Sequence, residues 1–129
     1  MKTKYRVLYV DDEESNLRIF KDTFRRDFEI ILAISAYQAM EVLEQKAIDI
    51  VITDQRMPGM TGVELLDLIN QKFPHIPPGR LIVSGFSDYD QIEKAFEQYK
   101  LFKFISKPWK YDELKQIILE AVENGKNST

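Results

Sequence analysis

Short apolar stretches of strand length alternate along the chain with segments whose apolar residues recur every three or four positions. The stretches are rich in Val, Ile, Leu and aromatic residues, as are strands that are buried on both faces of a sheet. They predict strands at Tyr5–Val10, Glu29–Ile34, Ile48–Thr53, Arg80–Ser84 and Leu101–Ile105. The alternation of the two patterns therefore indicates an α/β protein.

The segments between the strands carry the one-sided apolar stripe of amphipathic helices. Thr61 and Glu64 have the spacing of a capping box, which predicts a helix beginning there. In the last segment the stripe extends from Leu114 to Val122, and Asn124-Gly125 is expected to end that helix. The other stripes consist of Leu17, Phe20 and Phe24, then Val63, Leu66 and Ile69, then Ile92, Phe96 and Tyr99.

Strict alternation with right-handed crossovers predicts a doubly wound, five-stranded parallel sheet with helices on both faces. The expected strand order is 2-1-3-4-5, which is flavodoxin-like. A length of 129 residues suits one domain, which we expect to cover residues 1–125 with a frayed tail at 126–129. In such a sheet ligands bind outside the carboxyl ends of the strands, where the strand order reverses, between the first and third strands.

Polar residues stand at these strand ends. Three carboxylates in one crevice repel each other unless a cation lies among them, and oxygen ligands suit Mg²⁺. One carboxylate could then attack phosphorus while a lysine and a hydroxyl bind the phosphoryl oxygens, parts that Asp54, Lys107 and Ser84 fit. Each residue alone could be ordinary turn or helix-start chemistry, but together they fall at predicted carboxyl ends. The polar residues at the strand ends are Asp11-Asp12, Ser35, Asp54, Ser84 and Lys107.

Composition narrows the function classes. The chain has no cysteine, which excludes thiol nucleophiles and disulfides, and a net charge of −3, which argues against direct nucleic-acid binding. The first apolar run ends at Val10, before Asp11, so no export signal or membrane span is predicted and we expect a cytoplasmic protein. The single histidine, His75, lies in a proline-rich loop, so a phosphoryl donor must come from outside the chain. Trp109 is expected to be a hydrophobic lid on the last helix, with sensing of the site as the alternative.

The motifs resemble those of the CheY-like receiver domains of two-component response regulators, from Tyr5 to about Val122. They occur in the family's order and spacing, and they are Asp11-Asp12-Glu13, the stretch from Thr53-Asp54 through Met57-Pro58-Gly59 to Gly62, Val83-Ser84-Gly85 and Lys107-Pro108. The resemblance implies a phosphoprotein in which Asp54 accepts a phosphoryl group from a sensor histidine kinase or phosphotransfer protein. Such a chain assists its own phosphorylation and dephosphorylation and is not an enzyme with a separate substrate.

The resemblance also assigns the surrounding residues. Asp12 would bind Mg²⁺ directly and Asp11 through water, with Asp54 and the backbone carbonyl of Arg56 as further ligands. Lys107 would contact the phosphoryl oxygens, and its peptide bond to Pro108 would be cis. Ser84 and Phe104 match the switch pair, in positions where Thr and Tyr are commoner. Gln55, Arg56 and Phe86 lie where the family tunes phosphoaspartate lifetime.

The switched surface would comprise the fourth helix, the fifth strand and the last helix. It would serve an output domain, an effector protein or a homodimer, and the chain fits either a stand-alone regulator or part of a longer protein. One alternative is a Mg²⁺-dependent phosphohydrolase, but dehalogenase-type enzymes need a second Asp where Arg56 stands. Another is a phosphorylation-independent binding module, which usually lacks the Asp cluster or the Lys that this chain retains. The receiver interpretation is therefore favoured.

Overall fold

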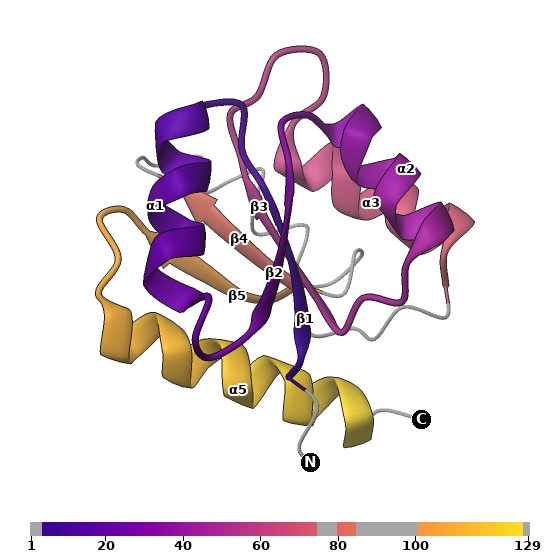
Figure 1. The fold of residues 1–129 in the computed structure, drawn as a ribbon. Helices are drawn as coiled ribbons and strands as arrows, with labels where there is room; N and C mark the ends of the chain where they lie inside the picture. The colour runs from indigo at the N-terminus through magenta and orange to yellow at the C-terminus, as the bar shows by residue number, and fades with distance from the viewer. Residues whose placement is uncertain (1–3, 75–79, 85–100, 128–129) are drawn as a thin grey trace.

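The computed structural model describes residues 4–74, 80–84 and 101–127. Its strands form one parallel sheet in the order β2-β1-β3-β4-β5, which confirms the predicted doubly wound, flavodoxin-like fold (Figure 1). The strands are β1 (Arg6–Val10), β2 (Glu29–Ala33), β3 (Ile50–Asp54), β4 (Arg80–Ser84) and β5 (Leu101–Ser106). The described helices are α1 (Glu14–Phe24), α2 (Ala36–Gln45), α3 (Gly62–Lys72) and α5 (Tyr111–Asn127).

The last helix differs from its prediction. We expected Asn124-Gly125 to end it, but α5 continues to Asn127. The division into a domain at 1–125 and a frayed tail at 126–129 stays a prediction. One glycine costs a helix only about 1 kcal/mol relative to alanine, which does not end a helix whose preceding turns are buried at Leu114 and Ile118. The helix predicted from Ile92, Phe96 and Tyr99, and the loop that holds His75, lie outside the described residues.

No apolar stripe was predicted for the segment that forms helix α2. Its start is set by Ser35, whose Oγ accepts a hydrogen bond of 3.1 Å from the backbone N–H of Gln38. Ser35 is therefore a helix cap, and this explains the polar residue found at the end of β2.

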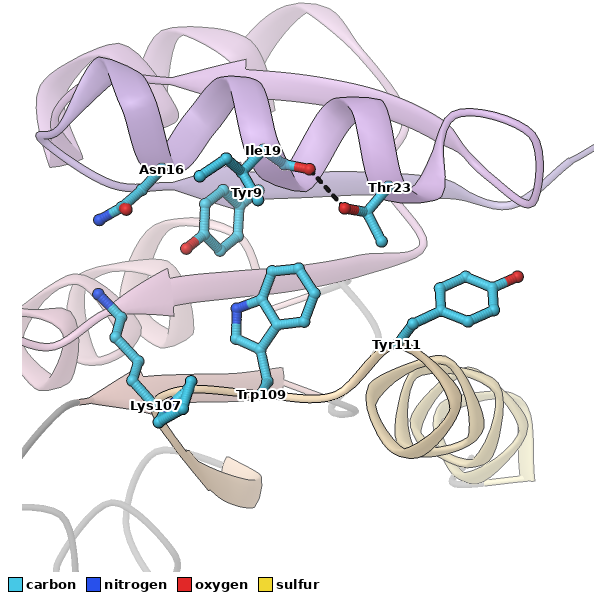
Figure 2. A pocket seen from close by; sticks show the side chains of 8 residues that line it. Tyr9, Asn16, Ile19, Thr23, Lys107, Trp109 and Tyr111 are labelled. Atoms are coloured by element: carbon cyan, nitrogen blue, oxygen red, sulfur yellow. Dashed lines mark hydrogen bonds between the residues drawn. The ribbon is translucent and has the colours of Figure 1, made fainter.

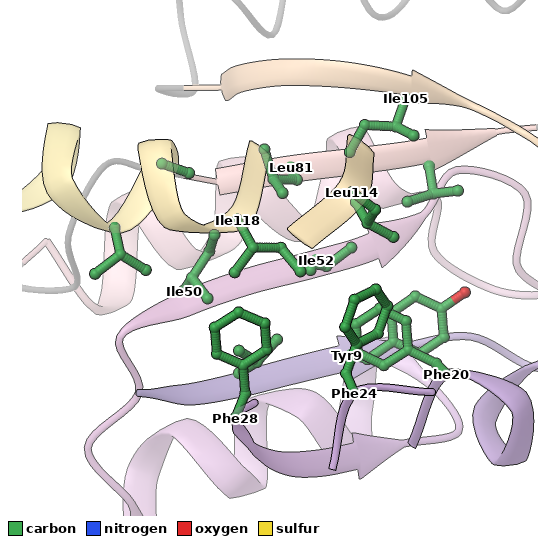
Figure 3. Packing of buried hydrophobic residues seen from close by; sticks show 14 of the residues in the cluster. Tyr9, Phe20, Phe24, Phe28, Ile50, Ile52, Leu81, Ile105, Leu114 and Ile118 are labelled. Carbon is green, nitrogen blue, oxygen red and sulfur yellow. The ribbon is translucent and has the colours of Figure 1, made fainter. Parts of the chain in front are cut away.

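The strands divide the core into two layers, because successive side chains point to opposite faces of a sheet. Leu8 and Val10 of β1 pack with residues of α2 and α3 on one face. Val7 and Tyr9 pack with residues of α1 and α5 on the other (Figures 1 and 3). Burial on both faces fixes the register of β1, and with it the position of the residues that follow Val10.

Aromatic rings join α1 to the segment between β5 and α5. Phe20 stacks on Tyr9, with ring centroids 4.1 Å apart and planes 2° from parallel. Trp109 packs against both α1 phenylalanines, at 6.0 Å from Phe20 and 5.5 Å from Phe24. This cluster packs the end of β1 against the beginning of the β5–α5 connection, and Figure 3 shows its rings of Tyr9, Phe20 and Phe24.

Helix α3 begins with the predicted capping box. The Oγ of Thr61 accepts a 3.2 Å hydrogen bond from the backbone N–H of Glu64, and the Glu64 carboxylate accepts one of 2.9 Å from the N–H of Thr61. Two backbone donors that the helix cannot satisfy are thus satisfied.

Replacing Thr61 by alanine is expected to lower the free energy of unfolding by about 1 kcal/mol, because the N–H of Glu64 loses its partner. Urea unfolding followed by circular dichroism measures this. The matched control is Thr23→Ala, which removes a hydroxyl that only donates to the carbonyl of Ile19 within α1, and it should cost less than about 0.5 kcal/mol. Equal losses in the two variants would contradict the role of the cap.

Candidate functional site

An acidic cluster lies where β1 and β3 end side by side. The two strands are paired in parallel, with Val10 opposite Thr53, so Asp11 and Asp54 reach the same edge of the sheet. Carboxylate oxygens of Asp11, Asp12 and Asp54 lie within 4.8 Å of one another. The structure therefore brings together the three carboxylates that the sequence singled out.

Asp11 is the most deeply buried of the three carboxylates. It is fully buried, and its backbone N–H donates to the carbonyl of Ala33 at 3.1 Å. Its Oδ1 accepts from the backbone N–H of Glu13 at 3.0 Å, and its Oδ2 accepts from the hydroxyl of Tyr9 at 3.0 Å. Burial, followed by the negative charge of Asp11, raises the pKa of Tyr9, so that hydroxyl stays protonated and remains a donor.

Lys107 supplies positive charge to the cluster. Its Nζ lies 3.3 Å from Oδ1 of Asp54 and 3.7 Å from Oδ2 of Asp11. Its backbone N–H donates to the carbonyl of Ser84 at 2.9 Å, and its bond to Pro108 is cis, as predicted. One ammonium group thus stands between two carboxylates from different strands.

The positive charge of Lys107 does not fully offset the effects that disfavour the ionised form of Asp54. Burial raises its pKa above the usual carboxyl value, the ammonium of Lys107 opposes this, and the charge of Asp11 raises it again. A hydrogen bond from the backbone of Gln55 also favours the ionised form. Because the pKa is raised on balance, one lysine does not fully offset burial and repulsion, and a further cation would stabilise the ionised cluster.

The donors fit a hard divalent cation such as Mg²⁺, which binds carboxylate, carbonyl and water oxygens. Asp11, Asp12 and Asp54 provide carboxylates close enough to share one ion, and half-buried Asp12 is open to solvent. Arg56 is exposed in the loop after β3, and its carbonyl remains a predicted ligand.

The loop after Asp54 is fastened to the start of α3. The side-chain oxygen of buried Gln55 accepts from the backbone N–H of Val63 at 2.9 Å, and its carbonyl accepts from Gly62 at 3.0 Å. A Cβ on Gly62 would stand 2.6 Å from the carbonyl oxygen of Asp54, so only glycine permits this approach. Gln55 thus has a structural role that its position in the sequence did not indicate.

Ser84 and Phe104 lie on neighbouring strands. Ser84 is buried at the end of β4, where it is opposite Ser106 of β5. Phe104 is half-buried and packs on the α2/α3 face, and the alternation of β4 places Ser84 on that same face, two residues after Ile82. The two residues of the predicted switch pair therefore share one side of the sheet.

A pocket of about 630 Å³ adjoins the cluster on the α1 side (Figure 2). Trp109, expected as a lid on the last helix, also packs on α1 and forms part of this wall. Tyr9 and Lys107 belong both to the pocket and to the acidic cluster, so the two are continuous. The full lining is Tyr9, Asn16, Ile19, Thr23, Lys107, Pro108, Trp109 and Tyr111.

Comparison with known proteins identifies the class of protein that this fold and site define. The sequence profile of the response regulator receiver domain matches residues 7–119, and the chain belongs to that family. The chain is 33% identical over 117 residues to the hydrogenase transcriptional regulatory protein HoxA of Cupriavidus necator. The match covers 91% of this chain and 24% of HoxA, so the chain spans about a quarter of that relative's length.

Solved structures agree. The signal receiver domain of an HD domain-containing protein from Pseudomonas fluorescens superposes with a TM-score of 0.89 at 28% identity, covering 97% of this chain and 99% of that one. A response regulator receiver domain protein from Clostridium thermocellum gives 0.85 at 29% identity, with coverages of 95% and 97%. Within the described ranges, no helix combines the length and hydrophobicity needed to cross a bilayer.

In metal-free buffer near neutral pH, Asp54→Asn is expected to unfold at a higher temperature than the wild type. Since the pKa of Asp54 is raised by folding, the folded protein holds the proton more tightly, and ionisation favours the unfolded chain. The gain should shrink as the pH falls through the raised pKa of folded Asp54, and it should vanish below the ordinary carboxyl pKa of about 3.9, where both states are protonated. Calorimetric melts across this pH range measure it.

The control is Asp67→Asn on α3, where the carboxylate only accepts from Gln71 and lies outside the cluster. It should show no comparable gain. A destabilised Asp54→Asn variant would mean that the ion pair with Lys107 outweighs burial and repulsion.

Proposed function

We propose that Asp54 is the phosphoacceptor of this receiver domain and takes its phosphoryl group from a phosphohistidine on a sensor histidine kinase or phosphotransfer protein. The observation that carries the proposal is the position of the Lys107 ammonium, 3.3 Å from an oxygen of Asp54 beside two further carboxylates. An Asp54 oxygen forms the new bond to phosphorus while the bond from phosphorus to the histidine nitrogen breaks. The nitrogen keeps that electron pair, and the product is an aspartyl phosphate.

Asp12, Asp54, the Arg56 carbonyl and, through water, Asp11 are the residues that would hold Mg²⁺. Bound there, the ion offsets the negative charge that nucleophile and phosphoryl group bring together. The ammonium of Lys107 would stabilise the same negative charge, and the hydroxyl of Ser84 would bind a phosphoryl oxygen. The alternatives remain unfavoured, because Arg56 cannot act as an acid and the Asp cluster and lysine are retained.

Phosphorylation would draw Ser84 toward the new oxygens and let the ring of Phe104 turn inward behind it. Both residues lie on the α2/α3 face, at the strands that border the predicted signalling surface. That surface includes α5 and β5 together with the helix predicted from Ile92 and Phe96. It would transmit the state of Asp54 to an output domain, an effector or a second copy of the chain.

The chain would act in the cytoplasm, assist the hydrolysis of its own aspartyl phosphate and leave nucleic-acid contacts to other domains. HoxA, named as a transcriptional regulatory protein, is about four times as long as the matched region. This length supports a receiver that controls a larger protein.

With Mg²⁺ and acetyl phosphate, the wild-type chain should gain one phosphoryl group, since nucleophile and cationic partner are both present. Intact-mass spectrometry measures the gain. Asp54→Asn should gain none, whereas Asp67→Asn, which alters a carboxylate outside the cluster, should be labelled like the wild type. Labelling of Asp54→Asn would overturn the assignment of the phosphoacceptor.

Lys107→Ala should bind Mg²⁺ no more weakly than the wild type, because it removes a positive charge from beside the carboxylates. Its phosphorylation should slow by about a hundredfold, the usual cost of losing one group that stabilises developing charge. Metal titration and the rate of mass gain separate the two effects. Lys110→Ala, which alters an exposed lysine of the same connection, is the control and should change neither. Loss of Mg²⁺ binding in Lys107→Ala would make Lys107 a structural residue.

A further inference from the structure

Among the described residues, Tyr9 contacts the acidic cluster but is not assigned by the motifs. Its side chain is 1% exposed, and its hydroxyl donates to Oδ2 of Asp11 at 3.0 Å. Its ring is fixed by the parallel stack on Phe20 at 4.1 Å. The hydroxyl therefore reaches Asp11 from a rigid support and does not depend on a flexible side chain.

Each carboxylate oxygen of Asp11 accepts a hydrogen bond from a different donor. Oδ1 accepts from the backbone N–H of Glu13, and Oδ2 accepts from Tyr9, both at 3.0 Å. This pair of donors determines the orientation of the carboxylate within the cluster. A fully buried carboxylate needs such partners, because a buried unpaired charge is costly.

Oδ2 also has a competing partner. Lys107 Nζ lies 3.7 Å from it, beyond hydrogen-bond distance, but 3.3 Å from Asp54. With the Tyr9 hydroxyl in place, Oδ2 is satisfied and Lys107 stays nearer to Asp54. If the hydroxyl is removed, Lys107 is the cation among the described residues that lies close enough to move onto Oδ2 of Asp11. Its ammonium would then occupy the cluster in place of a metal ion.

We propose that Tyr9 is a positioning residue for the metal-binding carboxylates: its hydroxyl orients Asp11 and keeps Lys107 directed toward Asp54. The proposal rests on the proposed function, because it takes Mg²⁺ as the ion that the cluster binds. Tyr9 would act through Asp11 and would touch neither the phosphoryl group nor the ion. Losing a partner that orients a metal ligand typically costs 10–100-fold in affinity, and the lower end applies here because Asp11 would reach the ion through water.

The test is Tyr9→Phe, which removes the hydroxyl but keeps the ring that stacks on Phe20. Mg²⁺ is titrated into each protein while amide signals are followed by NMR, so the midpoint does not depend on phosphorylation. The midpoint of Tyr9→Phe should lie at about tenfold higher Mg²⁺ than that of the wild type. The variant should melt cooperatively, showing that the fold is retained.

The matched control is Tyr111→Phe, which also removes a tyrosine hydroxyl, but one that donates to Asp27 outside the acidic cluster. It should leave the Mg²⁺ midpoint near that of the wild type. An unchanged or lower midpoint in Tyr9→Phe, or an equal rise in both variants, overturns the role of Tyr9. A wild-type chain that shows no Mg²⁺-dependent shifts overturns the metal part of the proposed function and this inference with it.

Discussion

Like-charge repulsion at a buried sheet edge is the constraint on which the site depends. The parallel pairing of β1 and β3 brings Asp11 and Asp54 to one edge, and burial there weakens the screening that water gives to exposed carboxylates. Burial, which is the largest effect, raises the pKa of Asp54, and the charge of Asp11 adds to it, while the ammonium of Lys107 offsets only part of the two. A cation bound among Asp11, Asp12 and Asp54 would relieve this unbalanced charge.

The two layers of the core support different parts of this arrangement. On the α1/α5 face, the rings of Tyr9, Phe20 and Trp109 form a continuous packed set that fixes the donor to Asp11 and the segment just after Lys107. On the opposite face, Phe104 packs beside the carboxyl end of β4. The charged groups are therefore held mainly by one layer, and the residues expected to respond to phosphorylation lie in the other.

Periodicity and strand-end chemistry predicted the sheet order and the meeting of Asp11, Asp12, Asp54 and Lys107, because topology alone brings carboxyl ends together. Sequence reasoning missed contacts that depend on side-chain direction. Tyr9 could have been found, since it precedes Asp11 by two residues and strand alternation turns both to one side, but its apolar neighbours made it look like core. The anchoring of α3 by Gln55 needs a three-dimensional turn that no periodic pattern contains. The predicted end of α5 was wrong because the burial of its earlier turns outweighed the tendency of Gly125 to end a helix.

The hydrogen bond from the backbone N–H of Lys107 to the carbonyl of Ser84 joins the backbones of the two residues whose side chains are proposed to contact the phosphoryl group. It continues the pairing of β4 and β5 one residue past Ser106, so the end of one strand cannot shift without moving the other. Phe104 lies two residues before Ser106 on the same strand, within reach of any such shift. A change in charge at Asp54 that attracted Lys107 would therefore act on the β4–β5 pair as a unit, and the proposed switch would reach the β5 side of the molecule by this route.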